Sequence, residues 1–133
     1  RGTGGRALGV RSPAEVGPWV AVALVALGGA AGSAARAGLG LAMPGAPLVA
    51  TLVVNVTGAF LLALVVERGR RQRRRLLAGT GFCGGFTTYS AVAVHVGELV
   101  QGAQPLMAAG YAMATLVAGA LATLGGIAVG SAR

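Results

Sequence analysis

Four apolar blocks, each about as long as a bilayer-crossing helix, restrict what this chain can fold into. They run from about Pro18 to Leu41, from Pro47 to Val66, from Leu76 to Val100 and from Pro105 to Val129. An α-helix needs about 20 mostly apolar residues to cross a hydrocarbon core about 30 Å thick. Because the connections between the blocks are short, the pattern predicts an all-α membrane protein with four transmembrane helices in one compact unit.

The composition agrees with a membrane location and gives no sign of an enzyme. Of the 133 residues, 55% are hydrophobic and 11% are charged, whereas soluble domains have about 25% charged residues. We find no nucleophile paired with a base and no phosphate-binding loop, so we expect no enzyme activity. The single cysteine, Cys83, excludes an internal disulfide. We predict a flexible tail over residues 1–17, one transmembrane domain over 18–130 and a C-terminal tail over 131–133.

The arginines are distributed very unevenly between the two sides of such a unit. All 11 basic residues are arginine, and the formal net charge is +8. In a soluble protein this charge would suggest nucleic acid, but here the arginines lie between and outside the apolar blocks, so we expect no nucleic-acid partner. Ten of them fall in the two tails and the second connection, and the other side has only Arg36. This bias predicts a multi-pass protein of the cell membrane with both termini in the cytoplasm.

Small residues are spaced for close packing of helices. Gly28 and Gly32 lie four residues apart in the first block, as do Ala31 and Ala35. Small residues at this spacing let membrane helices approach closely. Four such helices enclose little volume, so we expect a dimer or a larger assembly.

The second block contains an amide side chain near its centre. Asn55 lies one helical turn after Thr51 and three residues before Gly58. A polar side chain within a membrane is costly and therefore suggests a function. Two interpretations stay open: Asn55 forms a hydrogen bond between helices, or it donates hydrogen bonds to a permeating anion.

The third block contains the stretch GFCGGFTTYS at residues 81–90, which is unfavourable for a membrane helix. Its glycines, with Gly79, weaken the helix, and its hydroxyl side chains, including Thr87, Thr88 and Ser90, compete for backbone hydrogen bonds. We therefore predict a break in the third helix. Because a break survives in a membrane only where it is buried or lines a cavity, its backbone groups are candidates for an ion site. The alternative is an unbroken, glycine-rich packed helix.

Three further polar features allow both a structural and a functional interpretation. Arg36 either extends to the membrane interface or attracts anions to a vestibule. Tyr111 and Thr115 share one face of the fourth helix. His95 is the only histidine, and a packing role is favoured over a proton-coupled one.

Three stretches together resemble the CrcB (Fluc) family of fluoride channels. They are GGAAGSAAR at 28–36, TLVVNVTGAF at 51–60 and GFCGGFTTYS at 81–90. The resemblance extends over all four blocks in order, from about residue 24 to 130, and the third stretch is the most specific. It implies an antiparallel dimer of four-helix subunits, with two narrow pores that conduct fluoride passively out of the cytoplasm.

The resemblance also implies roles for particular residues. A structural sodium ion at the dimer centre would be held by the backbone carbonyls of Gly84 and Thr87. The fluoride pore would be lined by Asn55, Thr88, Tyr89, Ser90, Val92, Tyr111 and Thr115, with Arg36 in the vestibule. A fluoride ion is strongly hydrated, so a pore must replace its water with hydrogen-bond donors and the positive edges of aromatic rings.

The sequence departs from the family pattern at three positions. Val92 stands where the family has a second pore-lining phenylalanine, His95 where a glutamate is common, and Ala50 where glycine is usual. The change at Val92 removes one aromatic ring edge from the implied pore.

The arginine bias favours a heterodimer with a homologous subunit of opposite orientation, because a chain that inserts both ways should show little bias. A non-conducting structural subunit is one alternative function. A small multidrug-type exporter is another, but it needs a carboxylate within the membrane, and none of Glu15, Glu67 and Glu98 is near the middle of a block.

Overall fold

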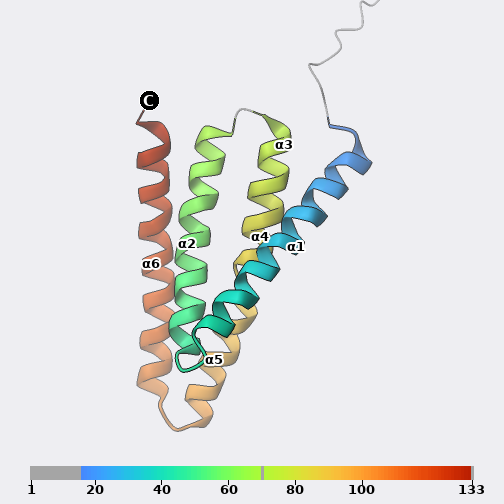
Figure 1. Ribbon diagram of the computed structural model, residues 1–133. Helices are drawn as coiled ribbons and strands as arrows, with labels where there is room; N and C mark the ends of the chain where they lie inside the picture. The colour runs from blue at the N-terminus through green and yellow to red at the C-terminus, as the bar shows by residue number, and fades with distance from the viewer. Residues whose placement is uncertain (1–15, 70, 133) are drawn as a thin grey trace, which may run out of the picture.

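The computed structural model describes residues 16–69 and 71–132, and this part of the chain contains helices and no strands. The elements are α1 (Pro18–Ala42), α2 (Pro47–Arg68), α3 (Gln72–Arg74), the π-helix η1 (Arg75–Cys83), α4 (Gly84–Phe86), α5 (Tyr89–Gln101) and α6 (Pro105–Ser131) (Figure 1). The tail predicted over 1–17 lies outside the described residues except for Val16 and Gly17.

Three helices are long and apolar enough to cross a membrane: α1, α2 and α6, with mean hydropathies of 1.6, 2.4 and 1.9. Each begins at a proline, Pro18, Pro47 or Pro105. Proline suits the first turn of a helix because its missing N–H would have no partner there. The predicted bounds of these three blocks are confirmed to within two residues.

The third block is divided, as the sequence predicted. Its first part consists of α3, η1 and α4, and its second part is α5. The two parts are separated by Thr87 and Thr88, whose backbone is extended. The π-helix in the first part was not predicted from the sequence.

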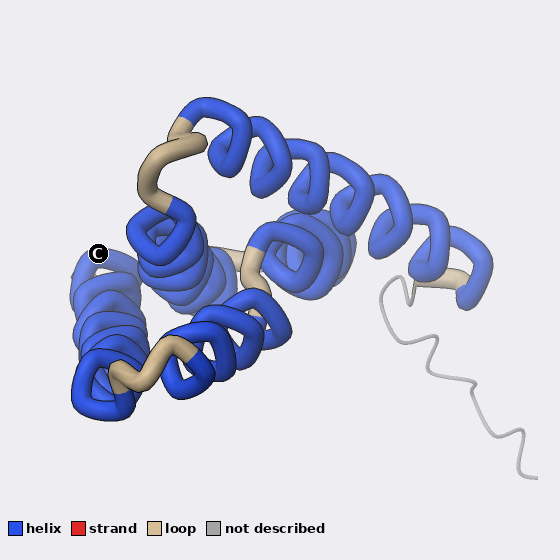
Figure 2. The backbone as a smooth tube through the Cα atoms, turned by 90° about the horizontal axis from the view of Figure 1, so that it is seen from below, coloured by secondary structure: helices blue, strands red, loops and turns tan. Residues whose placement is uncertain are grey.

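Two packed groups make up the helical unit. In Figure 1, α2 and α6 lie side by side along their length, while α1 crosses the η1–α4 segment obliquely. Figure 2 shows α1 on one flank and α6 on the other, with α2 and the divided third block between them. The beginning of α1 and the ends of α2 and α6 lie at the same end of the unit (Figure 1). This arrangement agrees with the sequence analysis, which grouped the two tails and the second connection on one side of the unit.

Glycines allow α1 to approach the divided block closely. Gly28 and Gly32 are buried. A Cβ atom on Gly28 would clash with the backbone of Leu77 and would lie 2.8 Å from Phe82 N. Ala31 and Ala35 are exposed. The predicted small-residue packing is therefore present on the glycine face of α1 and absent on the alanine face within this single chain.

The protein core of the unit is small. Its buried hydrophobic residues are Ala50, Val54, Ala63, Cys83, Phe86 and Ala108. Many large apolar side chains are exposed instead, among them Trp19 (83%) and Leu106 (87%). In a bilayer these side chains would contact lipid or another subunit, because lipid is as apolar a solvent as the helix surface.

Candidate ion-binding site at the helix break

Thr87 and Thr88 leave helical geometry and expose backbone groups in the middle of the third block. Thr87 has φ/ψ of −74°/156°, and Thr88 has −148°/118°. The side chain and N–H of Thr87 both bond the Cys83 carbonyl, at 2.9 and 3.0 Å. The N–H and hydroxyl of Thr87 thus have a hydrogen-bond partner within the preceding turn. The backbone N–H and carbonyl of Thr88 need partners from another part of the chain.

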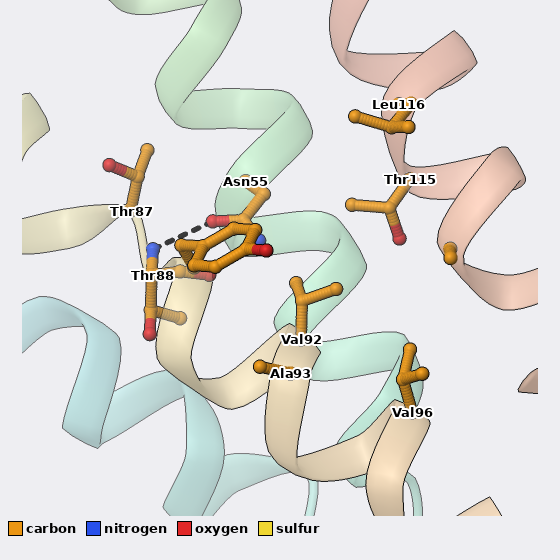
Figure 3. Close-up of a pocket in the computed structure, with 10 residues that line it drawn as sticks. Asn55, Thr87, Thr88, Val92, Ala93, Val96, Thr115 and Leu116 are labelled. Atoms are coloured by element: carbon orange, nitrogen blue, oxygen red, sulfur yellow. Dashed lines mark hydrogen bonds between the residues drawn. The ribbon is translucent and has the colours of Figure 1, made fainter. Parts of the chain in front are cut away.

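Asn55 on α2 supplies those partners. Its Nδ2 donates to the Thr88 carbonyl at 2.9 Å, and its Oδ1 accepts from the Thr88 N–H at 2.8 Å (Figure 3). The amide therefore pairs with a peptide unit of the break as another peptide would. The hydrogen bond between helices that the structural interpretation of Asn55 expects is therefore observed. The second Nδ2 hydrogen has no partner among the described residues, which leaves a donor for the interpretation as an anion ligand.

The same bonds leave two carbonyls without their helical donors. In a continuous helix the Thr88 N–H would bond the Gly84 carbonyl, but it donates to Asn55 instead. Likewise the Ala91 N–H would bond the Thr87 carbonyl, but it donates to Thr88 Oγ1 at 3.2 Å. Gly84 is exposed and Thr87 is partly exposed. Side chains at the break thus take the helical donors of the two carbonyl oxygens that the family resemblance implied as sodium ligands.

Thr88 is also the N-cap of α5, which leads to a stability prediction. Its hydroxyl accepts from the Ala91 N–H and lies 3.1 Å from Ser90 Oγ. We expect Thr88→Ala to lower the free energy of unfolding by about 1 kcal/mol through loss of the cap. Thr88→Ser, which keeps the hydroxyl, should retain most of that stability. Thermal unfolding in detergent measures the difference, and equal losses in the two variants would contradict the capping role.

A cavity of about 570 Å³ opens beside the break, between α2, α5 and α6. Its lining residues are Asn55, Thr87, Thr88, Tyr89, Val92, Ala93, Val96, Ala112, Thr115 and Leu116. The wall is mostly apolar; Asn55, Thr87 and Thr88 lie on the side of the break, and Thr115 lies on α6 across from it (Figure 3). Tyr89 is 85% exposed at the start of α5. The cavity combines a mostly apolar wall with few polar groups, which is typical of a ligand or ion site.

The structure brings some of the predicted site residues together and leaves others apart. Asn55, Thr88, Tyr89, Val92 and Thr115 all line the cavity, and so does Thr87. Gly84, Ser90, Tyr111 and Arg36 are not among its lining residues.

The polar residues predicted on α6 make backbone hydrogen bonds. Tyr111 Oη donates to the Leu48 carbonyl at 3.1 Å, which ties α6 to the start of α2. Thr115 Oγ1 donates to the Tyr111 carbonyl at 2.9 Å, one turn earlier in its own helix. Of the two, only Thr115 reaches the cavity.

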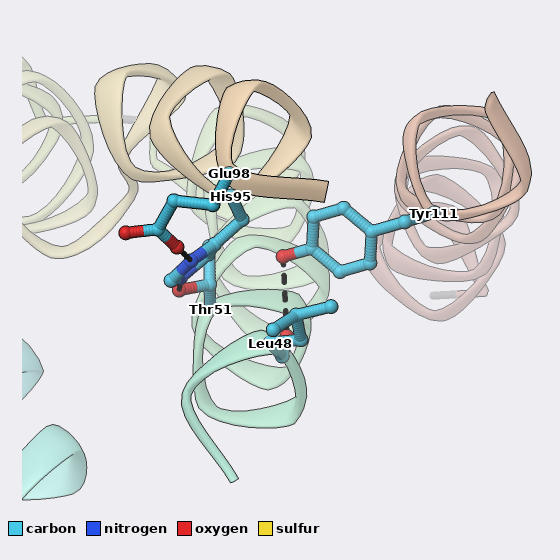
Figure 4. Close-up of polar contacts among 5 residues, drawn as sticks. All are labelled: Leu48, Thr51, His95, Glu98 and Tyr111. Carbon is cyan, nitrogen blue, oxygen red and sulfur yellow. Dashed lines mark hydrogen bonds and ion pairs between the residues drawn. The ribbon is translucent and has the colours of Figure 1, made fainter. Parts of the chain in front are cut away.

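His95 belongs to a polar cluster that the sequence analysis missed. Its Nε2 lies 3.1 Å from Thr51 Oγ1 on α2, and its Nδ1 lies 3.3 Å from a carboxylate oxygen of Glu98 (Figure 4). The ring of Tyr111 packs edge-on to the imidazole at 6.1 Å. The spacing of three residues between His95 and Glu98 could have indicated their contact. Nothing in the local sequence pairs His95 with Thr51, which is 44 residues away.

Side chains alone do not offer a metal site in the described part of the chain. No group of three or more histidine, cysteine, aspartate or glutamate residues comes together there. A cation bound near the break would therefore depend on backbone oxygens such as the carbonyls of Gly84 and Thr87, because hard cations take oxygen ligands.

Comparison with known proteins places the chain in a family. The family model "CrcB-like protein, Camphor Resistance (CrcB)" matches residues 23–127. The chain is 46% identical to "Fluoride-specific ion channel FluC 2" of Leifsonia xyli subsp. xyli, over 82% of each chain. It is 42% identical to "Fluoride-specific ion channel FluC 1" of Cutibacterium acnes, over 77% of this chain and 79% of the relative.

A third relative extends this agreement. "Fluoride-specific ion channel FluC 2" of Natronomonas pharaonis is 42% identical over 81% of this chain and 92% of its own length. The region matched by the family model includes the break and every residue that lines the cavity. This chain belongs to the CrcB family.

Proposed function

We propose that this protein is a fluoride channel of the cell membrane that lets fluoride leave the cytoplasm passively. The observation that supports this most directly is the cavity at the helix break, lined by Asn55, Thr88 and Tyr89, in a chain whose relatives are named fluoride-specific ion channels. The family is one of ion channels, and we assign no catalytic step to the chain.

The proposed mechanism replaces the water around fluoride with donors from the protein. The second Nδ2 hydrogen of Asn55 is held in place because the other amide atoms are bonded to Thr88. The Tyr89 ring adds a positive edge at the mouth of the cavity. Fluoride is small enough to form short hydrogen bonds to these donors, and those bonds have to compensate for the hydration that it loses beside a mostly apolar wall. The Thr115 hydroxyl donates to its own helix, so it is not among the donors to fluoride.

Val92 makes one part of this wall less favourable for an anion. It lines the cavity on α5 one turn after Thr88, and its aliphatic side chain has no positive edge. If a second subunit contributes a pore of its own, that pore can carry the larger share of the flux.

We further propose that a sodium ion binds at the break as a structural element. The carbonyls of Gly84 and Thr87 would hold it, since both have lost their helical donors. One chain offers fewer oxygens than sodium takes, so the carbonyls of a second chain would complete the site. The bound ion would link the two chains at their breaks.

The second chain is proposed to be a homologous four-helix subunit in the opposite orientation. The described arginines at the end of α2 and in the following segment are Arg68, Arg71, Arg73, Arg74 and Arg75, and Arg36 lies in the later part of α1. This bias favours a single orientation with cytoplasmic termini, and therefore a heterodimer. The second candidate function, a non-conducting partner subunit, is favoured by the aliphatic side chain at position 92.

Reconstitution into liposomes tests the function. Liposomes with this chain, alone or with its homologous partner, are loaded with fluoride or chloride, and efflux is followed with ion-selective electrodes. We expect rapid fluoride efflux and retention of chloride from at least one preparation. Absence of fluoride flux from both would overturn the channel proposal and favour a structural role. Efflux from a stable homodimer of this chain alone would overturn the heterodimer.

A further inference from the structure

A second hollow lies away from the break, between the end of α2 and the start of η1, and we propose that it binds an anionic glycerophospholipid. We call it the α2–η1 groove. It has a volume of about 290 Å³. Its lining consists of Leu64, Val65, Leu77 and Ala78, which we call the floor, together with Arg68, Gly69 and Arg74. We call the end at Arg74 the mouth.

The groove is amphipathic in the way that a phospholipid is. Its floor is apolar and can pack against an acyl chain, because Leu77 lines the groove and is 41% exposed. Its mouth has the guanidinium group of Arg74, whose planar array of donors suits a phosphate with two oxygens facing it. A small water-soluble anion would use the mouth but gain nothing from the floor. The combination therefore favours a lipid over free phosphate.

Arg74 is the guanidinium available to a phosphate at the groove, and it is exposed in α3. Arg68 also lines the groove, but its Nη2 donates to the Val129 carbonyl near the end of α6 at 2.6 Å. This contact draws the Arg68 guanidinium to the α6 side of α2. Arg68 therefore contributes to the wall of the groove, and Arg74 would bind the headgroup.

The groove also lies at the expected depth. The apolar run of α2 ends at Val66 and is followed by Glu67 and Arg68. This change marks the boundary between hydrocarbon and headgroups. Basic residues at such a boundary attract anionic lipids. Among described side chains near the groove, only Glu67 carries a negative charge, and it packs against Gly130 on the α6 side.

The test compares lipid retention by the purified full-length chain in detergent. Native mass spectrometry counts bound phosphatidylglycerol and phosphatidylcholine on the wild-type chain, on Arg74→Gln and on Ala78→Leu, which fills the floor without changing charge. Arg73→Gln is the matched control, since Arg73 is an exposed neighbour outside the groove. Loss of one charge-assisted bond should weaken phosphatidylglycerol retention roughly tenfold in Arg74→Gln.

The expected pattern is preferential retention of phosphatidylglycerol by the wild-type chain, its loss in both groove variants and its persistence in Arg73→Gln. An equal loss in Arg73→Gln and Arg74→Gln would overturn the proposal in favour of diffuse charge attraction. Unchanged retention in Ala78→Leu would remove the role of the floor and also overturn it. Failure of any lipid to bind while two chains associate through this groove would assign it to a protein interface. Circular dichroism on each variant confirms that the helices are retained, and none of these outcomes depends on fluoride conduction.

Discussion

Asn55→Asp is expected to abolish fluoride flux in reconstituted liposomes. The change replaces the Nδ2 donor with an oxygen that faces the Thr88 carbonyl, 2.9 Å away in the native pair. Leaving that buried acceptor unsatisfied costs about 1–3 kcal/mol, and a carboxylate beside the cavity repels an anion. Both effects act on the same site, so we expect efflux no faster than from protein-free liposomes, as measured with a fluoride electrode.

A neighbouring residue provides the control for this variant. Thr57 lies two residues further along α2 and is exposed, so Thr57→Ala changes the same helix without touching the break. It should conduct as the unmodified protein does. Wild-type flux through a folded Asn55→Asp protein would show that neither the amide donor nor its bond to Thr88 is needed.

Gly32→Ala should destabilise the protein strongly, although alanine favours helices over glycine by about 1 kcal/mol. The added Cβ would clash with the Phe82 carbonyl and lie 2.8 Å from Phe86 N. Both are backbone atoms, so a whole helix has to move. Overpacking of this kind costs about 1–3 kcal/mol, and we expect a clearly lower midpoint of thermal unfolding in detergent.

The adjacent glycine separates this clash from helix propensity. A Cβ on Gly29 would have its nearest neighbour, the Gly81 carbonyl oxygen, at 3.9 Å. Gly29→Ala should therefore leave stability unchanged or raise it. If the two variants unfolded at the same temperature, close contact between α1 and η1 would not be a determinant of stability.

Much of the fold was predictable because local signals determine it. Apolar length and the prolines at positions 18, 47 and 105 set the bounds of α1, α2 and α6. The run of glycines and hydroxyl residues around Thr87 indicated the break. The π-helix of η1 was not predictable in the same way, because it forms where Gly28 and Gly32 of α1 press against its backbone. That contact joins segments about 50 residues apart, and no local pattern encodes it.

The sequence predicted which residues belong to the site better than it predicted the hydrogen bonds that they form. Asn55 stood out because an amide is rare in an apolar block, but its partner Thr88 is 33 residues away and could not be read from spacing. Tyr111 was expected to share a polar track with Thr115, yet its hydroxyl donates to Leu48. Which hydrogen-bond partner a side chain meets depends on how the helices pack, and a single sequence does not show that packing.

The amide–peptide pair between Asn55 and Thr88 has a consequence for motion. Two short bonds tie the second residue of the break to the middle of α2, and the Thr88 hydroxyl holds the first turn of α5. A swing of α5 that carries Thr88 with it would break the two bonds to Asn55, and a swing that leaves Thr88 in place would break the cap bond. The break is consequently braced in both directions, and these bonds oppose its use as a hinge.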